Sequence, residues 1–321
     1  MTPFGVRKLN EEKPSFVPVV QIVFLGTGGS WPSPKRNVAA VAVKRGREII
    51  LFDCGEGTQR QFMKSSLSFM QVQKIFISHF HGDHFLGLPG LVQSMTLNDR
   101  SDPLGIWGPK GIVQLVRTLL ELGYFNPGFE VYVEELEDGS VVEFEEYSVK
   151  GIKMRHNVPS MGYVLEEKER AGKFYREKAL ELGLPEGPLF GRLQRGQAVK
   201  HDGRTITPDM VMGRSRPGMK IAYSGDTLPS RRFADAAKRS DVLIHDATTD
   251  ASLEEKANEF GHSSSRQAAQ TAKDCGVHKL FLVHISPRYE DVSTLEADAR
   301  AIFENSTVPD DFDEYTVRYR E

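Results

Sequence analysis

Cysteine and long apolar runs are nearly absent from this sequence. Its 321 residues include two cysteines, Cys54 and Cys275, and neither belongs to a CxxC pair. This count excludes a disulfide framework, so both are expected to be small buried hydrophobic residues. No apolar run approaches the roughly 20 residues of a membrane-spanning helix. The N-terminal stretch also lacks the apolar core of a signal peptide. We therefore expect a cytoplasmic protein that does not associate with membranes.

A strong excess of charge is also lacking. The net charge is -3, with 39% hydrophobic and 26% charged residues, which indicates a globular chain and argues mildly against nucleic-acid binding. Locally the balance differs. Between Gly191 and Lys220, seven Lys and Arg residues stand against two Asp, whereas residues 134–146 carry seven Asp and Glu and no Lys or Arg. Either segment could be a binding surface or simply a solvated face.

Short β-prone runs punctuated by glycine-rich turns open the chain, and helical patterns follow. The expected strands are residues 18–25, 39–43, 48–53, 74–78, 104–107, 129–133, 141–144, 147–154, 161–165, 219–224, 241–245 and 279–284, and the expected helices include 83–95, 112–122 and 172–182. Ser263 is the expected N-cap of a later helix. Each half has strands first and helices after, which predicts two packed sheets with helices outside, in one α/β domain spanning residues 1–321.

Two segments fit this single domain poorly. Residues 166–215 are rich in Gly, Pro and Arg and show little apolar periodicity, which indicates an inserted arm or long excursion. Residues 1–18 precede the first clear strand and are expected to be an N-terminal extension, for which the sequence suggests no function.

The segment His79–His84, HFHGDH, carries the strongest chemical signal. Three histidines and one aspartate within six residues are hard to explain as structure. If the backbone stays extended after the preceding strand, the side chains of His79 and His81 point to the same side. Gly82 then permits a tight turn that brings Asp83 and His84 back toward them. Imidazole and carboxylate suit zinc or a similar cation. One ion cannot use all four groups in comfortable tetrahedral geometry, and two ions need further ligands.

Three later residues are candidates for these ligands. His156, Asp226 and His284 each end a β-prone run and precede turn chemistry, which is where functional side chains often lie. Taken singly, each could equally well be a structural residue.

Together these residues resemble the metallo-β-lactamase superfamily, in which an HxHxDH loop, a later His, an Asp and a final His follow in this order. The resemblance implies a four-layer αββα sandwich that binds two divalent metal ions per subunit, with Zn²⁺ expected and Mn²⁺ an alternative. It implies that one ion is held by His79, His81 and His156, the second by Asp83, His84 and His284, that Asp226 bridges them, and that Asp53 supports a ligand histidine.

Seven ordered motifs make the resemblance narrower. They are GTGGSWPSPKRN (26–37), FDCGEGTQRQ (52–61), ISHFHGDHFLGLPGL (77–91), HNVPSMGY (156–163), SGDT (224–227), HDAT (245–248) and GHSS (261–264). From about Val20 to Pro287 they resemble ribonuclease Z, the endonuclease family that removes 3′ trailers from precursor tRNA. The resemblance implies Asp83 as general base and Asp246 with His262 as the proton-donating pair. The family often has Glu at the position of Asp246, so the shorter side chain must reach further.

The same resemblance gives the basic segment a meaning. It implies that residues 166–215 form a flexible arm that grips tRNA, because residues 181–199 resemble the GP-containing stretch of the family's arm. Arg192, Arg195 and Lys200 would then neutralise phosphates. A homodimer is implied as well, since the family's arm grips RNA bound at the other subunit, and no further protein partner is expected. A noncatalytic loop is the alternative.

Lys35 and Arg36 are expected to contact substrate. The family's loop often reads P-x-K-x-R-N, whereas here Pro34 stands where that lysine would fall and Lys35 is shifted by one residue. Discrimination against mature CCA ends is therefore not carried over.

Two other functions remain as alternatives. A metallohydrolase acting on a small ester, such as a cyclic nucleotide phosphodiesterase or an arylsulfatase-like relative, would not need the basic arm. A catalytically silent RNA-binding scaffold is disfavoured, because all seven expected ligand positions are filled.

Overall fold

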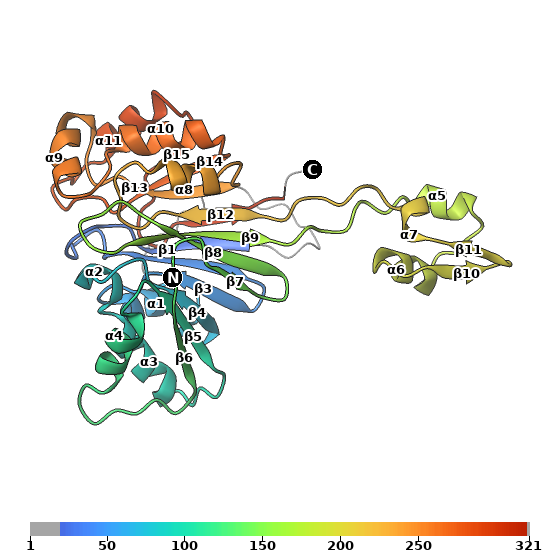
Figure 1. Ribbon diagram of the computed structural model, residues 1–321, viewed down its shortest axis with the longest axis horizontal. Coiled ribbons are helices and arrows are strands. Elements are labelled where there is room, and N and C mark those ends of the chain that lie inside the picture. Colours follow the sequence, from blue (N-terminus) through green and yellow to red (C-terminus); the bar gives the residue numbers. More distant parts are fainter. Residues whose placement is uncertain (1–19, 320–321) are drawn as a thin grey trace.

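Two sheets packed face to face form the centre of the protein (Figure 1). The computed structural model describes residues 20–319. The first sheet comprises β1 (Val20–Gly26), β2 (Ala40–Arg45), β3 (Glu48–Phe52), β4 (Val72–Phe76), β5 (Leu104–Gly108), β6 (Val131–Glu135) and β16 (Glu314–Val317). The second comprises β7 (Val141–Glu143), β8 (Tyr147–Lys153), β9 (Met161–Glu167), β12 (Lys220–Tyr223), β13 (Val242–Asp246), β14 (Lys279–Val283) and β15 (Ser306–Thr307). The strand orders are β16-β1-β2-β3-β4-β5-β6 and β15-β14-β13-β12-β9-β8-β7.

Helices cover the outer face of each sheet. The first sheet carries α1 (Thr58–Lys64), the 3-10 turn Phe69–Gln71, α2 (Gly82–Phe85), α3 (Leu88–Leu97) and α4 (Ile112–Leu120). The second carries α8 (Arg231–Ala236), the 3-10 turn Ala251–Leu253, α9 (Glu254–Glu259), α10 (Ser265–Cys275) and α11 (Ser293–Arg300). The four layers confirm the expected αββα sandwich. No helix in the described part of the chain is both long and apolar enough to cross a bilayer.

Aromatic side chains fill the space between the sheets. The ring of Phe52 on β3 stacks on Tyr163 of β9 and on Tyr223 of β12, with centroids 6.0 and 5.4 Å apart. All three side chains are fully or almost fully buried. Because a sheet in this position is covered on both faces, its central strands can be apolar at nearly every position, as β3 is. Packing on both faces fixes the strand ends, and those ends carry the candidate site.

Some local expectations were wrong. The single helix expected at residues 83–95 is divided into α2 and α3 near Gly87, which packs so closely that an added Cβ would lie 2.1 Å from the carbonyl oxygen of Gly55. The N-cap of α10 is Ser264, which forms a capping box with Gln267, because the Ser263 hydroxyl instead donates to the carbonyl oxygen of Thr227. Strands β15 and β16 were not expected, although β16 pairs with β1 from the opposite end of the described chain.

The acidic run at residues 134–146 is partly structural. It includes the end of β6 and all of β7, which are edge strands of the two sheets. The contacts are Trp107 Nε1 to Glu134 at 2.9 Å, Gly111 N to Glu135 at 2.8 Å, Arg232 to Asp138 at 2.5 Å and Arg45 to Glu146 at 2.5 Å. Four of its seven carboxylates therefore have partners within the protein, which removes much of the case for a separate acidic binding surface.

The segment expected to be an arm projects from the sandwich as a small body on a two-stranded stalk (Figure 1). It contains α5 (Arg176–Glu181), α6 (Pro188–Gln194), β10 (Val199–His201), β11 (Arg204–Ile206) and α7 (Pro208–Val211). In the stalk, Gly172 lies so close to its neighbour that an added Cβ would be 2.0 Å from the carbonyl oxygen of Gly213. The body has its own apolar core, formed by Ala179, Leu184, Leu193, Val199, Ile206 and Val211. The arm is thus a packed unit with a hydrophobic core, which the weak apolar periodicity of its sequence did not suggest. The expected N-terminal extension, residues 1–18, lies outside the described residues.

Candidate metal centre and active site

The candidate residues lie where strands end. His79 and His81 follow β4, Asp226 follows β12, and His284 follows β14. β4 is parallel to its two neighbours in the first sheet, and β12, β13 and β14 are mutually parallel in the second. The carboxyl ends of parallel strands meet at one edge, so residues more than 200 positions apart converge there.

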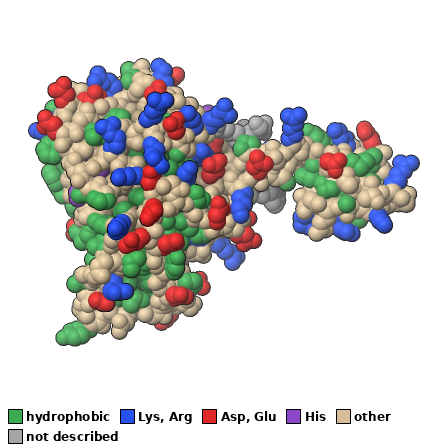
Figure 2. All heavy atoms as spheres, in the orientation of Figure 1, with side chains coloured by type: hydrophobic (Ala, Val, Ile, Leu, Met, Phe, Trp, Pro, Cys, Tyr) green, Lys and Arg blue, Asp and Glu red, His purple; other side chains and the backbone are tan. Residues whose placement is uncertain are grey.

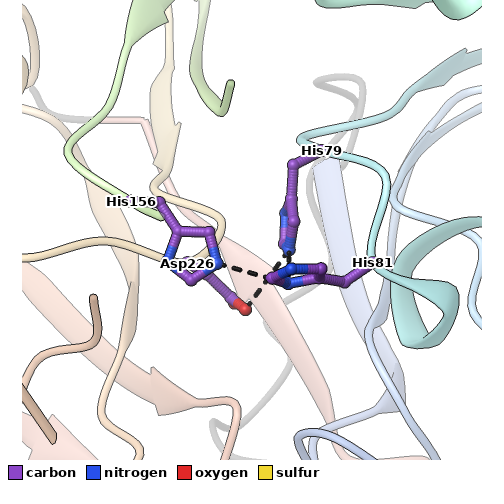
Figure 3. Close-up of side chains that lie close together, drawn as sticks. All are labelled: His79, His81, His156 and Asp226. Atoms are coloured by element: carbon purple, nitrogen blue, oxygen red, sulfur yellow. Dashed lines mark hydrogen bonds and ion pairs between the residues drawn. The ribbon is translucent and has the colours of Figure 1, made fainter. Parts of the chain in front are cut away.

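His79, His81, His156 and Asp226 form one group, whose potential ligand atoms all lie within 4.8 Å of one another. Figure 3 shows the three imidazoles turned toward a common point. His81 Nδ1 lies 3.0 Å from His79 Nε2 and 3.3 Å from His156 Nε2, and Asp226 Oδ2 lies 3.6 Å from His79 Nε2. Imidazole nitrogens and a carboxylate oxygen in such an arrangement are a suitable donor set for a divalent cation.

Asp83, His84 and His284 form a second such group. Asp83 Oδ2 lies 3.4 Å from His284 Nε2 and 3.6 Å from His84 Nε2. Asp226 Oδ2 lies 3.2 Å from the same nitrogen of each histidine, so its carboxylate faces both groups. His84 Nε2 is buried and has no hydrogen-bond partner among the described residues. A cation between these residues would satisfy that nitrogen, so the residues present fit a metal ion.

Asp53 fixes the orientation of His84 from behind. Its Oδ2 lies 2.8 Å from His84 Nδ1 and accepts hydrogen bonds from the hydroxyls of Tyr223 at 2.6 Å and Ser78 at 2.7 Å. The Ser78 N–H donates to Oδ1 at 2.6 Å. Burial alone would lower the pKa of His84, but the carboxylates of Asp226 and Asp53 outweigh it and raise that pKa well above its usual value. The sequence suggested Asp53 but not Ser78 or Tyr223, because only the packing of the two sheets brings the Tyr223 hydroxyl here.

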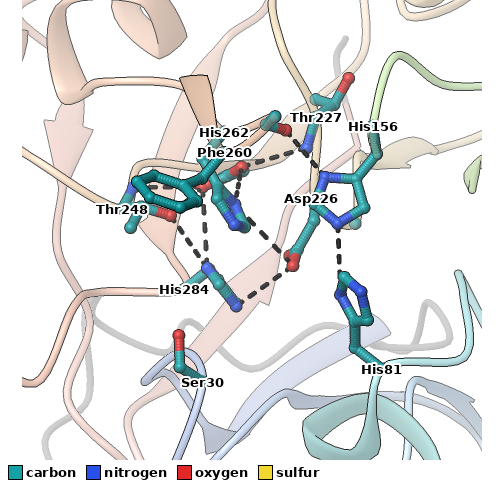
Figure 4. A network of polar contacts seen from close by, with 12 residues as sticks. Ser30, His81, His156, Asp226, Thr227, Thr248, Phe260, His262 and His284 are labelled. Carbon is teal, nitrogen blue, oxygen red and sulfur yellow. Dashed lines mark hydrogen bonds and ion pairs between the residues drawn. The ribbon is translucent and has the colours of Figure 1, made fainter. Parts of the chain in front are cut away.

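His262 lies beside the second group (Figure 4), and Asp246 is its neighbour. Asp246 Oδ2 is 3.1 Å from His262 Nδ1, so the shorter aspartate does reach. The ring of His262 stacks on that of His284, with centroids 4.9 Å apart and planes 13° from parallel. Burial opposes the charged form of His262, but the adjacent Asp246 carboxylate outweighs it and raises the pKa of His262 to about 9. The pair can therefore hold a proton close to the metal-binding groups.

Thr248 links this pair to the second group. Its hydroxyl donates to Asp246 Oδ1 at 2.7 Å, and the same oxygen lies 2.9 Å from His284 Nδ1. The threonine belongs to a motif that the sequence singled out, HDAT, but its contact to His284 depends on β13 and β14 being neighbours. It helps to fix the orientation of the His284 imidazole, as metal-binding histidines require.

The loop between β1 and β2 closes one side of the centre. The Ser30 N–H donates to Asp83 Oδ2 at 2.7 Å. Asp311, from the C-terminal segment, accepts the N–H groups of Thr27 at 3.0 Å and Asn37 at 2.6 Å, which fixes both ends of the loop. Gln61 reaches the same carboxylate at 2.9 Å.

Arg36 has a structural role in this loop. Its guanidinium donates to Thr27 Oγ1 and to the carbonyl oxygen of Pro309, both at 2.6 Å, and to Asp310 at 2.7 Å, and the residue is 8% exposed. It therefore stabilises the loop, and its contact with substrate stays a prediction. Lys35 is exposed, and its amine donates to the carbonyl oxygen of Glu290 at 3.1 Å.

The three cations expected to bind RNA all lie on the arm. Arg192, Arg195 and Lys200 are exposed, and Figure 2 shows several basic side chains on the surface of the arm's body. They are separated from the metal-binding groups by the stalk (Figure 1).

Comparison with known proteins finds a family model, curated relatives and solved structures that match this chain. A family model described as anti-Pycsar protein Apyc1 matches residues 20–171. Ribonuclease Z of Methanosarcina acetivorans is 46% identical over 303 residues, 94% of this chain and 99% of the relative. Ribonuclease Z of Thermoplasma volcanium is 46% identical over 301 residues, 94% and 98% of the two chains. The crystal structure of human tRNase Z, short form, superposes with a TM-score of 0.69 and 30% identity, covering 93% of this chain and 99% of that one.

Replacing Asp53 by Asn tests whether this carboxylate supports the metal centre. Asp53 has a φ of 57°, which Asn tolerates, but an amide nitrogen would face groups that donate to the carboxylate. We expect metal affinity to fall roughly 10–100-fold, measured by competition with a chelator. Asp291→Asn, an exposed aspartate, is the matched control. Unchanged affinity in a folded Asp53→Asn protein would contradict the role.

Proposed function

Because the chain belongs to the ribonuclease Z family of metal-dependent endoribonucleases, which process the 3′ ends of tRNA, we propose that it removes the 3′ trailer of precursor tRNA with two divalent ions. The observation that carries the proposal is Asp226, whose Oδ2 lies 3.2 Å from a nitrogen of His84 and of His284 and 3.6 Å from His79. One carboxylate oxygen that faces two groups of nitrogen ligands is the arrangement expected of a two-ion centre.

The assignment of ligands follows the two groups. We assign His79, His81 and His156 to one ion, Asp83, His84 and His284 to the other, and Asp226 to both. Two such ions would supply Lewis-acid activation of water and neutralise charge at the scissile phosphate. Zinc suits these imidazole and carboxylate ligands, and manganese is an alternative.

Asp83 is the proposed general base. Its Oδ2 receives the Ser30 N–H, which holds the carboxylate in one orientation at the edge of the centre. A fixed carboxylate in this place can accept a proton from water that attacks the phosphorus.

His262 is the proposed proton donor to the departing ribose oxygen. Asp246 favours its charged form, and Asp246 is in turn kept ionised by the N–H groups of Thr227 at 3.0 Å and Thr248 at 3.1 Å. Burial and the nearby Asp226 carboxylate would raise the pKa of Asp246, but His262 and His284 lower it. His262 is partly exposed, so a substrate oxygen can reach its ring.

The arm supports a large substrate. An independently packed body with exposed Arg192, Arg195 and Lys200 has no use in the hydrolysis of a small ester, whereas phosphates of a folded RNA would bind such cations. We further propose a homodimer, in which the arm of one subunit contacts RNA bound at the centre of its partner. This subunit arrangement rests on the family resemblance alone.

Incubation with a 3′-extended tRNA and, separately, with a chromogenic phosphodiester tests the function. After chelation and reloading with zinc or manganese, we expect cleavage near the 3′ end of the tRNA body with release of the trailer. Loss of the reaction on chelation is the control for contaminating ribonucleases. Turnover of the small ester alone would mean that the RNA assignment is wrong.

Neutralising the arm tests how it acts. We expect the variant R192A/R195A/K200A to raise KM for precursor tRNA roughly tenfold or more. The slope of log kcat/KM against log salt concentration should become shallower by about one for each phosphate that the arm no longer neutralises. Turnover of the small ester should not change. The matched control removes three exposed cations of the sandwich, Arg47, Lys150 and Lys273. Equal losses of activity on precursor tRNA and on the small ester would mean that the three substitutions disturb the structure of the protein.

Changing Asp246 to Asn tests the proton donor through the pH profile. Below its pKa His262 is charged and can donate, so activity should fall as pH rises through that value. Without the Asp246 carboxylate the pKa of His262 falls, so the alkaline limb should begin at lower pH. Asp274→Asn, an exposed aspartate on α10, is the control. A variant that is slower but keeps the alkaline limb of the wild type would contradict this role.

A further inference from the structure

Trp31 lines a small cavity that the proposed function does not use. Its side chain is 63% exposed, which is unusual for an indole. The cavity measures about 190 Å³ and lies between two loops. One loop follows β1 and contributes Trp31, Ser33, Pro34 and Lys35, and the other follows β14 and contributes Ile285, Ser286, Pro287, Tyr289 and Glu290.

This cavity adjoins the metal-binding groups. The Gly29 N–H donates to the carbonyl oxygen of Ile285 at 3.0 Å, which joins the two loops, and Ile285 directly follows His284. Ser30, next to Trp31, donates its N–H to Asp83. Figure 4 shows Ser30 close to His284. A group in the cavity would therefore lie next to a phosphate held at the centre.

Both loops are held in place, so the backbone that carries the indole has a fixed position. Arg36 and Asp311 fix the first loop from beneath, and the Ser33 N–H donates to the carbonyl oxygen of Arg36 at 2.8 Å. In the second loop, the Tyr289 hydroxyl accepts the Asp250 N–H at 3.0 Å. A rigid aromatic surface loses little conformational entropy when it binds a ligand.

The chemistry of the lining identifies the ligand class. The cavity is smaller than the 300–1,000 Å³ or so of sites for drug-sized molecules, which suits a single flat ring system. An exposed indole offers a stacking face, Ser286 offers a hydroxyl that can donate, and Lys35 adds a cation at the surface. Every nucleobase has a face that can stack on an aromatic ring, and bases of unpaired RNA are recognised in this way.

We propose that this cavity is a subsite for one unpaired nucleobase adjoining the cleaved phosphate, stacked on the indole of Trp31. The subsite rests on the proposed function, because a nucleobase lies here only if the centre holds an RNA phosphate. Stacking on Trp31 would add binding energy at the cleavage site, separate from the contacts between the arm's cations and RNA phosphates.

Tryptophan fluorescence tests binding without any cleavage. The chain has two tryptophans, and Trp107 is 6% exposed and stacked on Phe76. In a Trp107→Phe protein, Trp31 is the only tryptophan, and we expect AMP and UMP to quench its emission saturably while ribose 5-phosphate does not. The matched Trp31→Phe protein should not respond. No response of Trp31, or an equal response to ribose 5-phosphate, would overturn the subsite.

Cleavage of modified precursor tRNA tests the position of the base. An abasic nucleotide placed on one or the other side of the cut should lower kcat/KM for the wild type roughly 5–100-fold at one of the two positions. On intact RNA, Trp31→Ala should lower kcat/KM by a similar factor. On the RNA that is abasic at the sensitive position, the same substitution should lower kcat/KM little further. Trp31→Phe should recover part of the kcat/KM that Trp31→Ala loses on intact RNA.

The outcomes of this second experiment are separable. The subsite is wrong, and the enzymatic assignment stands, if Trp31→Ala cleaves intact RNA as the wild type does. The same conclusion follows if the losses of kcat/KM from Trp31→Ala and from the abasic nucleotide multiply in full when the two are combined. If the wild type does not cleave precursor tRNA, the proposed function fails, whatever the fluorescence shows.

Discussion

The carboxylate of Asp226 is 2% exposed and lies within 3.6 Å of three imidazole nitrogens, on His79, His84 and His284. Two more carboxylates, Asp53 and Asp246, are fully buried nearby. Buried negative charge is costly unless positive charge or hydrogen-bond donors compensate it. The strand ends of both sheets supply such donors. Divalent cations bound here compensate the negative charge that these donors leave. The arrangement of the sheets is therefore also what keeps this concentration of charge tolerable.

Local patterns allowed much of this to be predicted. The spacing of His79 through His84 identified a metal site without knowledge of the fold, because few structural roles need those residue types so close together. His156, Asp226 and His284 could be assigned only through the family resemblance, since their convergence depends on sheet order. The same limit explains why Tyr223 and Thr248 were missed. Their hydroxyls reach Asp53 and Asp246 only after the strands have packed.

Charge was the least informative property of the sequence. Arg36 was expected to contact substrate, and the structure uses its guanidinium for three contacts within the protein. Much of the acidic run is likewise occupied by Trp107, Gly111, Arg45 and Arg232. The basic residues of the arm remain exposed because the arm's small core is covered by few elements. A sequence states the sign of a charge, whereas the fold decides whether the charge is available.

The contacts of the C-terminal segment have a consequence for synthesis of the chain. Asp311 and Pro309 hold the loop that follows β1, and β16 pairs with β1 itself. These partners leave the ribosome nearly 300 codons after the strand that they complete. Until these residues have been made, β1 has no partner on the side of β16, and the loop that follows β1 lacks these contacts. A chain that stopped after His284 would contain all the candidate ligands but would still lack the contacts that hold the loop beside them.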